Sequence, residues 1–143
     1  MARSRMINRA LVSKDNFMQL SCSTQLLYFH LCLNADDDGF VDNAISLMRQ
    51  LPVNVEDLRT LIEKGFVLIM EDYLYVITHW RMHNRIDRNH YSPTSYLEYM
   101  RKLSVDENNV YSLGLGKGTN LYDYQVGRGF IEEPEASLKK KET

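Results

Sequence analysis

The sequence predicts an α+β fold, mainly helical, in which three helices are followed by a β-hairpin. Apolar residues recur at helical spacing over residues 24–64, and Asp, Gly and Pro interrupt them where turns are needed. The spacing then changes, because residues 66–70 (FVLIM) and 73–77 (YLYVI) are β-rich runs joined by Glu71 and Asp72. With 143 residues, of which 44% are hydrophobic, the chain is long enough for one domain and a tail.

The first long helix is expected over residues 24–34 (TQLLYFHLCLN), with Ser23 as its N-cap. Apolar residues lie on almost every side of it, which predicts a central, buried helix. The segment ADDDGFVD that follows predicts a turn, after which residues 40–41 pair as a short strand. Ahead of this helix, residues 5–12 predict a short opening strand or turn, and residues 13–20 a short helical turn.

Two further helices are expected before the hairpin. One covers residues 43–51 and ends at Pro52. The other covers residues 55–64, with Asn54 as its N-cap and Gly65 at its end. A buried helix, a short strand, two helices and a hairpin in this order form a winged helix-turn-helix, in which the hairpin is the C-terminal wing.

An extra helix and loop extension is expected after the hairpin. Residues 94–103 predict a helix, whereas residues 104–131 hold five of the seven glycines and predict a loop with one or two short strands. Residues 132–143 are charged, which predicts disorder. We therefore divide the chain into a winged-helix domain (1–103), a Gly- and Tyr-rich extension (104–131) and a tail (132–143).

The formal net charge of −2 conceals an uneven distribution. Residues 1–14 hold four bases and no acid, residues 15–78 hold three bases against ten acids, and residues 79–102 hold five bases against two acids. Two basic segments therefore flank an acidic middle. Clustered Lys and Arg side chains are what phosphate contacts require, so the two basic segments are the candidate binding surfaces.

The cysteines and the hydropathy pattern predict a cytoplasmic protein. Cys22 and Cys32 lie among apolar residues and form no Cys-x-x-Cys motif, which predicts buried free thiols in a reducing compartment. No run of 18 apolar residues occurs, and no apolar stretch follows the N-terminal arginines. The sequence therefore predicts neither a membrane span nor a secretory signal, and no membrane partner.

Three blocks of sequence carry a resemblance to a known family: LSCSTQLLYFHLCLNADDDGFVDN, LIEKGFV and VITHWRMHNRIDRNHYSPTSYLEYMRKL. Over residues 5–103 the chain resembles the N-terminal domain of phage replisome organisers, relatives of the DnaD-type primosome proteins of Gram-positive bacteria. The resemblance implies a winged-helix module in the bacterial host cytoplasm that binds origin DNA and helps to start DNA replication. The chain departs from the family by stopping soon after this domain, so recruitment of a helicase loader is in doubt, and a fragment and a short phage protein remain alternatives.

Twelve residues are expected to contact duplex DNA. They are Arg3, Arg5, Arg9 and Lys14 in the N-terminal arm, Asn54, Arg59 and Thr60 on the third helix, and Arg81, His83, Asn84, Arg85 and Arg88 after the hairpin. The third helix is an unusual DNA reader, because acids outnumber bases on its outer face and repel phosphates.

That acidic face leaves an alternative open. The chain could be a non-catalytic protein-interaction module, a phage inhibitor or assembly factor that docks on a host or phage protein through this face. Replication proteins are further partners that the resemblance implies, and the sequence leaves a homo-oligomer open.

Two loop motifs imitate ligand sites. Residues 34–39 (NADDDG) resemble the start of an EF-hand, but Ile45 occupies the twelfth position, where a bidentate Glu is needed. We expect a capped turn whose carboxylates accept backbone N–H groups. Residues 114–119 (GLGKGT) have neither the spacing of a P-loop nor its preceding strand and following helix, so a flexible turn is expected.

No catalytic or metal site is expected. His79 and His83 could share a helical face, but zinc needs two more ligands at suitable spacing. Cys22, Cys32 and His30 lie in the buried helix region, where His30 is expected to be a packed core imidazole. No carboxylate pair, Ser/His/Asp set or Cys/His dyad stands out, so the chain is expected not to be an enzyme and to need no cofactor.

Overall fold

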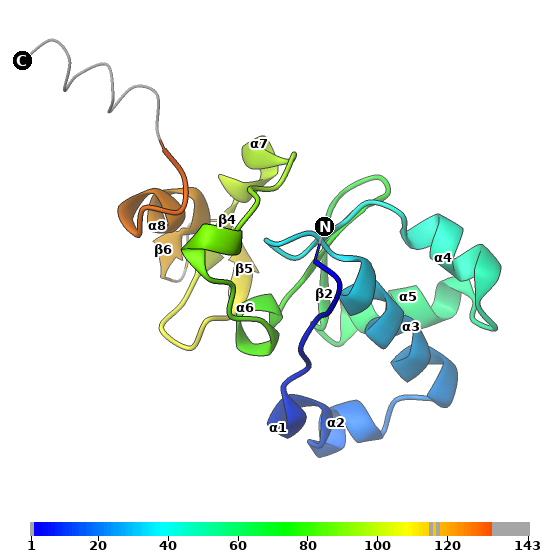
Figure 1. Cartoon of the computed structure of the whole chain (residues 1–143). Helices are drawn as coiled ribbons and strands as arrows, with labels where there is room; N and C mark the ends of the chain where they lie inside the picture. The colour runs from blue at the N-terminus through cyan, green and yellow to red at the C-terminus, as the bar shows by residue number, and fades with distance from the viewer. Residues whose placement is uncertain (1, 115, 117, 133–143) are drawn as a thin grey trace, which may run out of the picture.

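A computed structural model describes residues 2–114, 116 and 118–132 (Figure 1). In this part the chain is an α+β structure with eight α-helices and two small antiparallel sheets. The helices are α1 (Arg9–Val12), α2 (Asp15–Met18), α3 (Cys22–Asn34), α4 (Ala44–Gln50), α5 (Val55–Glu63), α6 (Trp80–His83), α7 (Leu97–Met100) and α8 (Leu121–Gly127), with a 3-10 turn η1 (Arg88–His90). The strands are β1 (Phe40–Val41), β2 (Val67–Glu71), β3 (Leu74–Ile77), β4 (Leu103–Val105), β5 (Tyr111–Leu113) and β6 (Thr119–Asn120).

The first half of the chain has the predicted order of elements. Helix α3 packs against α4 and α5, and the hairpin β2–β3 pairs with β1 in a sheet of order β1-β3-β2. In this sheet Phe40 lies opposite Val76. The hairpin turn is shifted by one residue from the prediction, because Glu71 ends β2 and Tyr73 takes the left-handed backbone conformation, with φ 70°.

Five apolar residues from α3, α5 and β3 share one core. Leu27, Leu31, Leu58, Leu61 and Ile77 are each no more than 4% exposed and belong to one cluster. Burying a side chain of this kind stabilises the fold by about 1.5–3 kcal/mol. This cluster fixes α3 and α5 against the first sheet.

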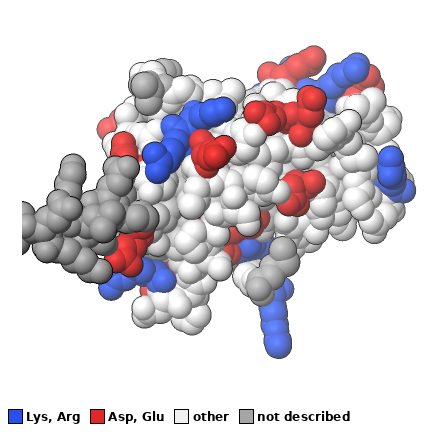
Figure 2. Space-filling view, turned by 90° about the horizontal axis from the view of Figure 1, so that it is seen from above, with Lys and Arg blue, Asp and Glu red and all other residues white. Residues whose placement is uncertain are grey.

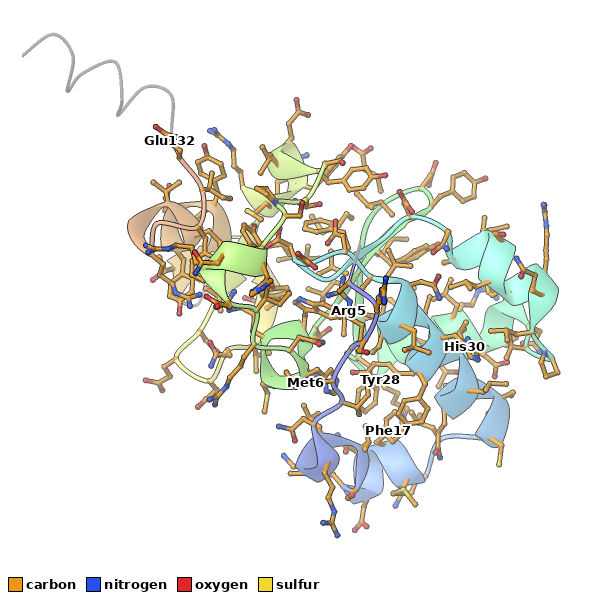
Figure 3. All side chains as sticks on the ribbon, viewed as in Figure 1. Arg5, Met6, Phe17, Tyr28, His30 and Glu132 are labelled. Carbon is orange, nitrogen blue, oxygen red and sulfur yellow. The ribbon has the colours of Figure 1, made fainter. Side chains whose placement is uncertain are left out.

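The start of α3 and the surroundings of its cysteines and histidine differ in part from the prediction. Ser21, not Ser23, is the N-cap and accepts a hydrogen bond from the Thr24 amide, so α3 begins at Cys22. Cys22 is therefore exposed, which corrects the expectation, whereas Cys32 is buried as expected. Burial raises the pKa of the Cys32 thiol to about 12. His30 is half-buried on α3 rather than inside the core (Figure 3).

The N-terminal segment was expected as a strand or turn over residues 5–12. Instead, residues 2–8 have no regular structure and descend from the centre of the view to α1, which residues 9–12 form (Figure 1). The Asn8 side chain accepts a hydrogen bond from the Leu11 amide, and this cap explains why a helix begins at residue 9. The short helical turn expected within residues 13–20 is α2.

The prediction for the region after residue 93 was largely wrong. The helix expected over residues 94–103 is reduced to the four residues of α7, and Leu103 begins β4, where it is buried. Residues 103–120 form a second sheet of order β5-β4-β6, and helix α8 follows it. The boundary drawn after residue 103 therefore falls within β4.

Both halves share one hydrophobic cluster. Met100, Leu103, Tyr111 and Leu121 belong to the same cluster as the core of the first half. The Tyr111 amide also donates a hydrogen bond to the carbonyl of Thr78, at 2.9 Å. None of the helices in the described ranges has the length and apolar character that would let it cross a membrane.

Candidate nucleic-acid interface

The two basic segments of the sequence lie side by side. The Met6 amide donates to Asn84 Oδ1 and the Asn8 amide to His83 Nδ1, each at 2.8 Å. Asn8 Nδ2 donates to the carbonyl of Met82, at 3.3 Å. Because these bonds join residues more than 70 positions apart, the N-terminal arm is held against α6 and the segment after it.

His83 and Asn84 serve this contact, although the sequence assigned them to DNA. His83 is 3% exposed. Since its Nδ1 accepts from the Asn8 amide, Nε2 carries the proton and donates to the Tyr28 hydroxyl, at 2.6 Å. Burial, assisted by neighbouring His79, lowers the pKa of His83 to about 4, so the ring is neutral at pH 7 and offers phosphate no charge. Asn84 is 8% exposed, and its Nδ2 has no acceptor among the described residues.

Arg5 is also engaged inside the protein. Its guanidinium donates to Asp37 Oδ1 at 2.9 Å and to the carbonyl of Ala35 at 2.8 Å. It also lies 5.1 Å from the ring centroid of Trp80, and its side chain is only 5% exposed. Figure 3 shows Arg5 in the middle of the molecule, where it joins the arm to the loop after α3. With these contacts Arg5 supports the fold and is not free to meet a phosphate.

Five of the remaining candidates are exposed cations. Arg3, Arg9 and Lys14 belong to the arm and its first helices, and Arg85 and Arg88 follow α6. None of the five forms an ion pair with a carboxylate in the described part of the chain. We call these five side chains the basic ridge.

Two parts of the ridge lie next to each other. Ala2, Ser4 and Met6 line one surface hollow together with Arg85, which places the neighbourhood of Arg3 beside that of Arg85. Helices α1 and α2 lie at the lower end of the molecule in Figure 1. The face seen from above shows basic and acidic side chains interspersed among uncharged ones (Figure 2).

The three candidates near α5 are occupied by the helix itself. Asn54 caps it and accepts from the Glu56 amide at 2.9 Å, as predicted. Arg59 pairs with Glu56 at 2.8 Å, and the Thr60 hydroxyl donates to the carbonyl of Glu56 at 2.9 Å. The Arg59 pair is exposed and therefore worth less than about 1 kcal/mol, so it would open readily.

The NADDDG loop is a capped turn, as the sequence predicted. Asp36 Oδ1 accepts from the amides of Asp38 and Phe40, each at 3.0 Å. Among the described residues, no group of three or more His, Cys, Asp and Glu side chains is placed to hold a metal ion.

The same loop binds the second half of the chain, which the sequence did not reveal. Asp38 is 1% exposed and accepts from the Tyr91 hydroxyl at 2.6 Å, the Thr94 amide at 2.9 Å and Gln125 Nε2 at 3.4 Å. Burial raises the pKa of Asp38 to about 6, and the hydrogen bonds that favour its charged form oppose this effect.

Arg81, the last candidate, belongs to a cluster that sequence reasoning missed. Arg81 and Arg128 both donate to Gln125 Oε1, at 3.5 and 3.3 Å, and each guanidinium lies 5.1 Å from the ring centroid of Tyr124. Three of these residues come from α8 and its C-cap, a region expected to be a loop. One signal in the sequence could have predicted α8: Asn120 is a typical N-cap residue, and Asp123 follows it three positions later.

The GLGKGT segment lies in the second sheet, between β5 and β6, and residues 115 and 117 fall outside the described residues. Contrary to expectation, a strand precedes it and, after β6, the helix α8 follows. A Cβ on Gly118 would lie 2.2 Å from the carbonyl oxygen of Val105, so the glycine there serves a close approach of two strands.

The five ridge cations have no carboxylate partner among the described residues, and guanidinium and ammonium groups of this kind can neutralise phosphate oxygens. No protein-family model, curated protein or solved structure matches this chain.

Proposed function

We propose that the protein is a DNA-binding module that contacts the phosphates of duplex DNA through the basic ridge. The observation that carries this proposal is the hydrogen-bonded pairing of residues 6 and 8 with residues 82–84. That pairing unites two basic segments from opposite ends of the first half of the chain. Cations without acidic partners attract the negatively charged backbone without regard to its sequence.

The order of elements supports a winged-helix module. Helix α3, strand β1, helices α4 and α5 and the hairpin β2–β3 follow one another as in that fold, with β1 against β3. In such a module α5 would approach the major groove. Its outer face carries Glu56 and Glu63, so affinity comes from the arm and from the segment after α6. The resemblance to phage replisome organisers supports a role for this binding at the start of DNA replication.

Salt dependence gives the sharpest test. If the five ridge cations each neutralise one phosphate, the logarithm of the affinity falls with the logarithm of salt concentration with a slope of about −4 to −5. The Arg85→Ala, Arg88→Ala double variant should flatten the slope by about two and weaken random and specific duplexes alike. Fluorescence anisotropy with a labelled duplex at several salt concentrations measures both quantities.

A matched control separates the ridge from overall charge. Arg101 and Lys102, which follow α7, are exposed and lie outside the ridge. Their double replacement by Ala changes the net charge by the same amount and should leave the slope unchanged. An equal loss in both double variants would show that only net charge matters and would overturn the ridge.

A second candidate function rests on α5. Its exposed face carries Glu56 and Glu63, and Val55 beside them is 53% exposed, a combination suited to a basic protein partner. Glu56→Gln with Glu63→Gln should leave duplex binding unchanged or strengthen it, because two repulsive charges are removed. If this variant instead abolishes a protein complex while the Arg85 and Arg88 variant is silent, the interaction module replaces the DNA-binding module.

A further inference from the structure

A cavity of about 250 Å³ lies between α6 and α8. Three guanidinium groups line it, from Arg81, Arg85 and Arg128. Three amide residues, Asn84, Asn109 and Gln125, and several aromatic rings also line it. A pocket with this lining is unlike a purely structural void, because structural voids in proteins are apolar.

The positive charges in this cavity converge. Arg81 and Arg128 share Gln125 Oε1 as acceptor, at 3.5 and 3.3 Å, so their guanidinium groups lie close to each other. Gln125 is 1% exposed, and its Nε2 donates to Asp38 at 3.4 Å, which turns Oε1 toward the two arginines. Like charges held together repel each other, and a bound anion would relieve the repulsion.

No carboxylate neutralises these arginines in the described part of the chain. Neither Arg81 nor Arg85 nor Arg128 forms an ion pair there. Asp37 lines the same cavity, but its carboxylate is paired with Arg5 at 2.9 Å and accepts from the Ser92 amide at 2.9 Å. The cavity therefore keeps an excess of positive charge.

Two buried donors in the cavity wall also lack acceptors. Arg81 Nε and Asn84 Nδ2 have no hydrogen-bond partner among the described residues. Asn84 Oδ1 accepts a hydrogen bond from the Met6 amide, so a flip of the side-chain amide, which would exchange Oδ1 and Nδ2, would break this bond. Buried donors without acceptors are rare and call for an explanation. A ligand rich in acceptor oxygens supplies one.

We propose that this cavity binds a phosphate monoester, as found on a nucleotide or at the 5′ end of a DNA strand. A monoester presents three terminal oxygens and a charge close to −2, which suits several convergent guanidinium forks. A backbone phosphate inside a duplex carries a sugar on each side and would meet only the exposed Arg85 and Arg128 at the mouth. The site goes beyond the proposed duplex contacts, because Gln125 and Arg128 are not part of the ridge.

Calorimetric titration of the full chain with thymidine monophosphate, thymidine and inorganic phosphate tests the site directly. The monophosphate should bind and thymidine should not. Arg128→Gln should weaken monophosphate binding roughly tenfold to a hundredfold, the loss expected for a hydrogen bond to a charged group. Arg128→Lys, which keeps the charge, should retain part of the affinity. Inorganic phosphate binding as tightly as the monophosphate would also support the site and identify free phosphate as its natural source.

Arg101 provides the matched control. Arg101 and Arg128 are both exposed, and each guanidinium lies over a tyrosine ring, at 4.1 Å from the centroid of Tyr122 and 5.1 Å from that of Tyr124, respectively. Only Arg128 lines the cavity. Arg101→Gln should leave monophosphate binding unchanged. Equal binding of thymidine and its monophosphate, or an equal loss in the Arg101 and Arg128 variants, would overturn the proposal.

A second pair of probes separates this site from the ridge. Two duplexes of identical sequence, one with 5′-phosphate and one with 5′-hydroxyl ends, are compared at one salt concentration. The 5′-phosphate duplex should bind more tightly, and Arg128→Gln should remove only that preference. If the monophosphate binds but the 5′-hydroxyl duplex does not, the cavity stands and the proposed duplex-binding function fails. If the 5′-hydroxyl duplex binds but the monophosphate does not, duplex binding stands and the cavity proposal fails.

Discussion

Replacement of Arg5 by Met would break the buried ion pair that fastens the N-terminal arm. The Arg5 and Asp37 side chains are 5% and 10% exposed, so little water would reach the carboxylate left behind. Removing one partner of a buried pair costs about 3–5 kcal/mol. Asp37 keeps the hydrogen bond from the Ser92 amide and lines a cavity, which places the expected loss near the lower end, about 3 kcal/mol.

Urea denaturation followed by circular dichroism measures this loss. A decrease of about 3 kcal/mol in the free energy of unfolding corresponds to a melting temperature lower by roughly 10 °C in a chain of this size. Arg3→Met, the matched control two residues away, removes an exposed arginine and should change stability by less than about 0.5 kcal/mol.

The two variants should behave oppositely with DNA. At a temperature where both are folded, Arg5→Met should keep the salt slope of duplex binding, whereas Arg3→Met should flatten it by about one. Equal unfolding midpoints for the two variants, or a loss of the salt slope in folded Arg5→Met, would refute the assignment of Arg5 to the fold.

Four further predictions concern buried residues and the NADDDG loop. The pKa of His83 is lower in the folded chain than in the unfolded chain, so neutral His83 contributes fully to stability above pH 6.5. As the pH falls from 6.5 toward 4, this contribution decreases by about 1.4 kcal/mol for each pH unit. Urea denaturation between pH 7 and 4.5 should therefore show a steeper loss of stability for the natural chain than for His83→Gln. Asp38 has the opposite sign, because its pKa is raised to about 6: protonation on acidification favours the folded state, so Asp38→Asn should steepen the acid-side loss. Gly39→Ala should lower the free energy of unfolding by about 2–5 kcal/mol, because φ is +92° and the new Cβ would lie 2.6 Å from Trp80 Cγ. Its control, Gly65→Ala, has φ +82° but open space around the new Cβ and should lose about 1–2 kcal/mol. Similar melting temperatures for the two variants would contradict the clash with Trp80. Millimolar calcium should leave the melting temperature unchanged, because the carboxylates of the NADDDG loop already accept protein hydrogen bonds, and a rise of several degrees would show that the loop opens to bind the ion.

The first half of the fold was predictable because its signals are local. Asn54 caps α5, and Pro52 lies between α4 and α5. The two β-rich runs, residues 66–70 and 73–77, are separated by only two residues, which locates the hairpin turn to within one residue. Where two local signals compete, tertiary contacts decide. Ser21 and Ser23 are both candidate caps at the start of α3, but the Ser23 hydroxyl donates to Asp57 on α5, and Ser21 caps the helix.

The site was less predictable, because its geometry depends on distant contacts. Arg3 and Arg5 are alike in the sequence, and only the position of Asp37 separates an exposed cation from a buried one. Gln125 and Arg128 could not be connected to Arg81 while α8 was read as a loop. Strands of two or three residues, such as β4 and β6, are too short to show an alternating pattern, so the sequence predicted one or two short strands in a loop but not a second sheet.

The three aspartates after α3 have a consequence for how the chain opens. Their partners include Arg5, Tyr91, Thr94 and Gln125, and the Asp38 contacts alone span up to 87 positions of sequence. Contacts of such separation form late in folding, since long loops must close first. They also merge the two sheets into a single cooperative unit, so amides of β3 and β4 should exchange their hydrogens at the same rate, through one shared opening rather than two separate ones.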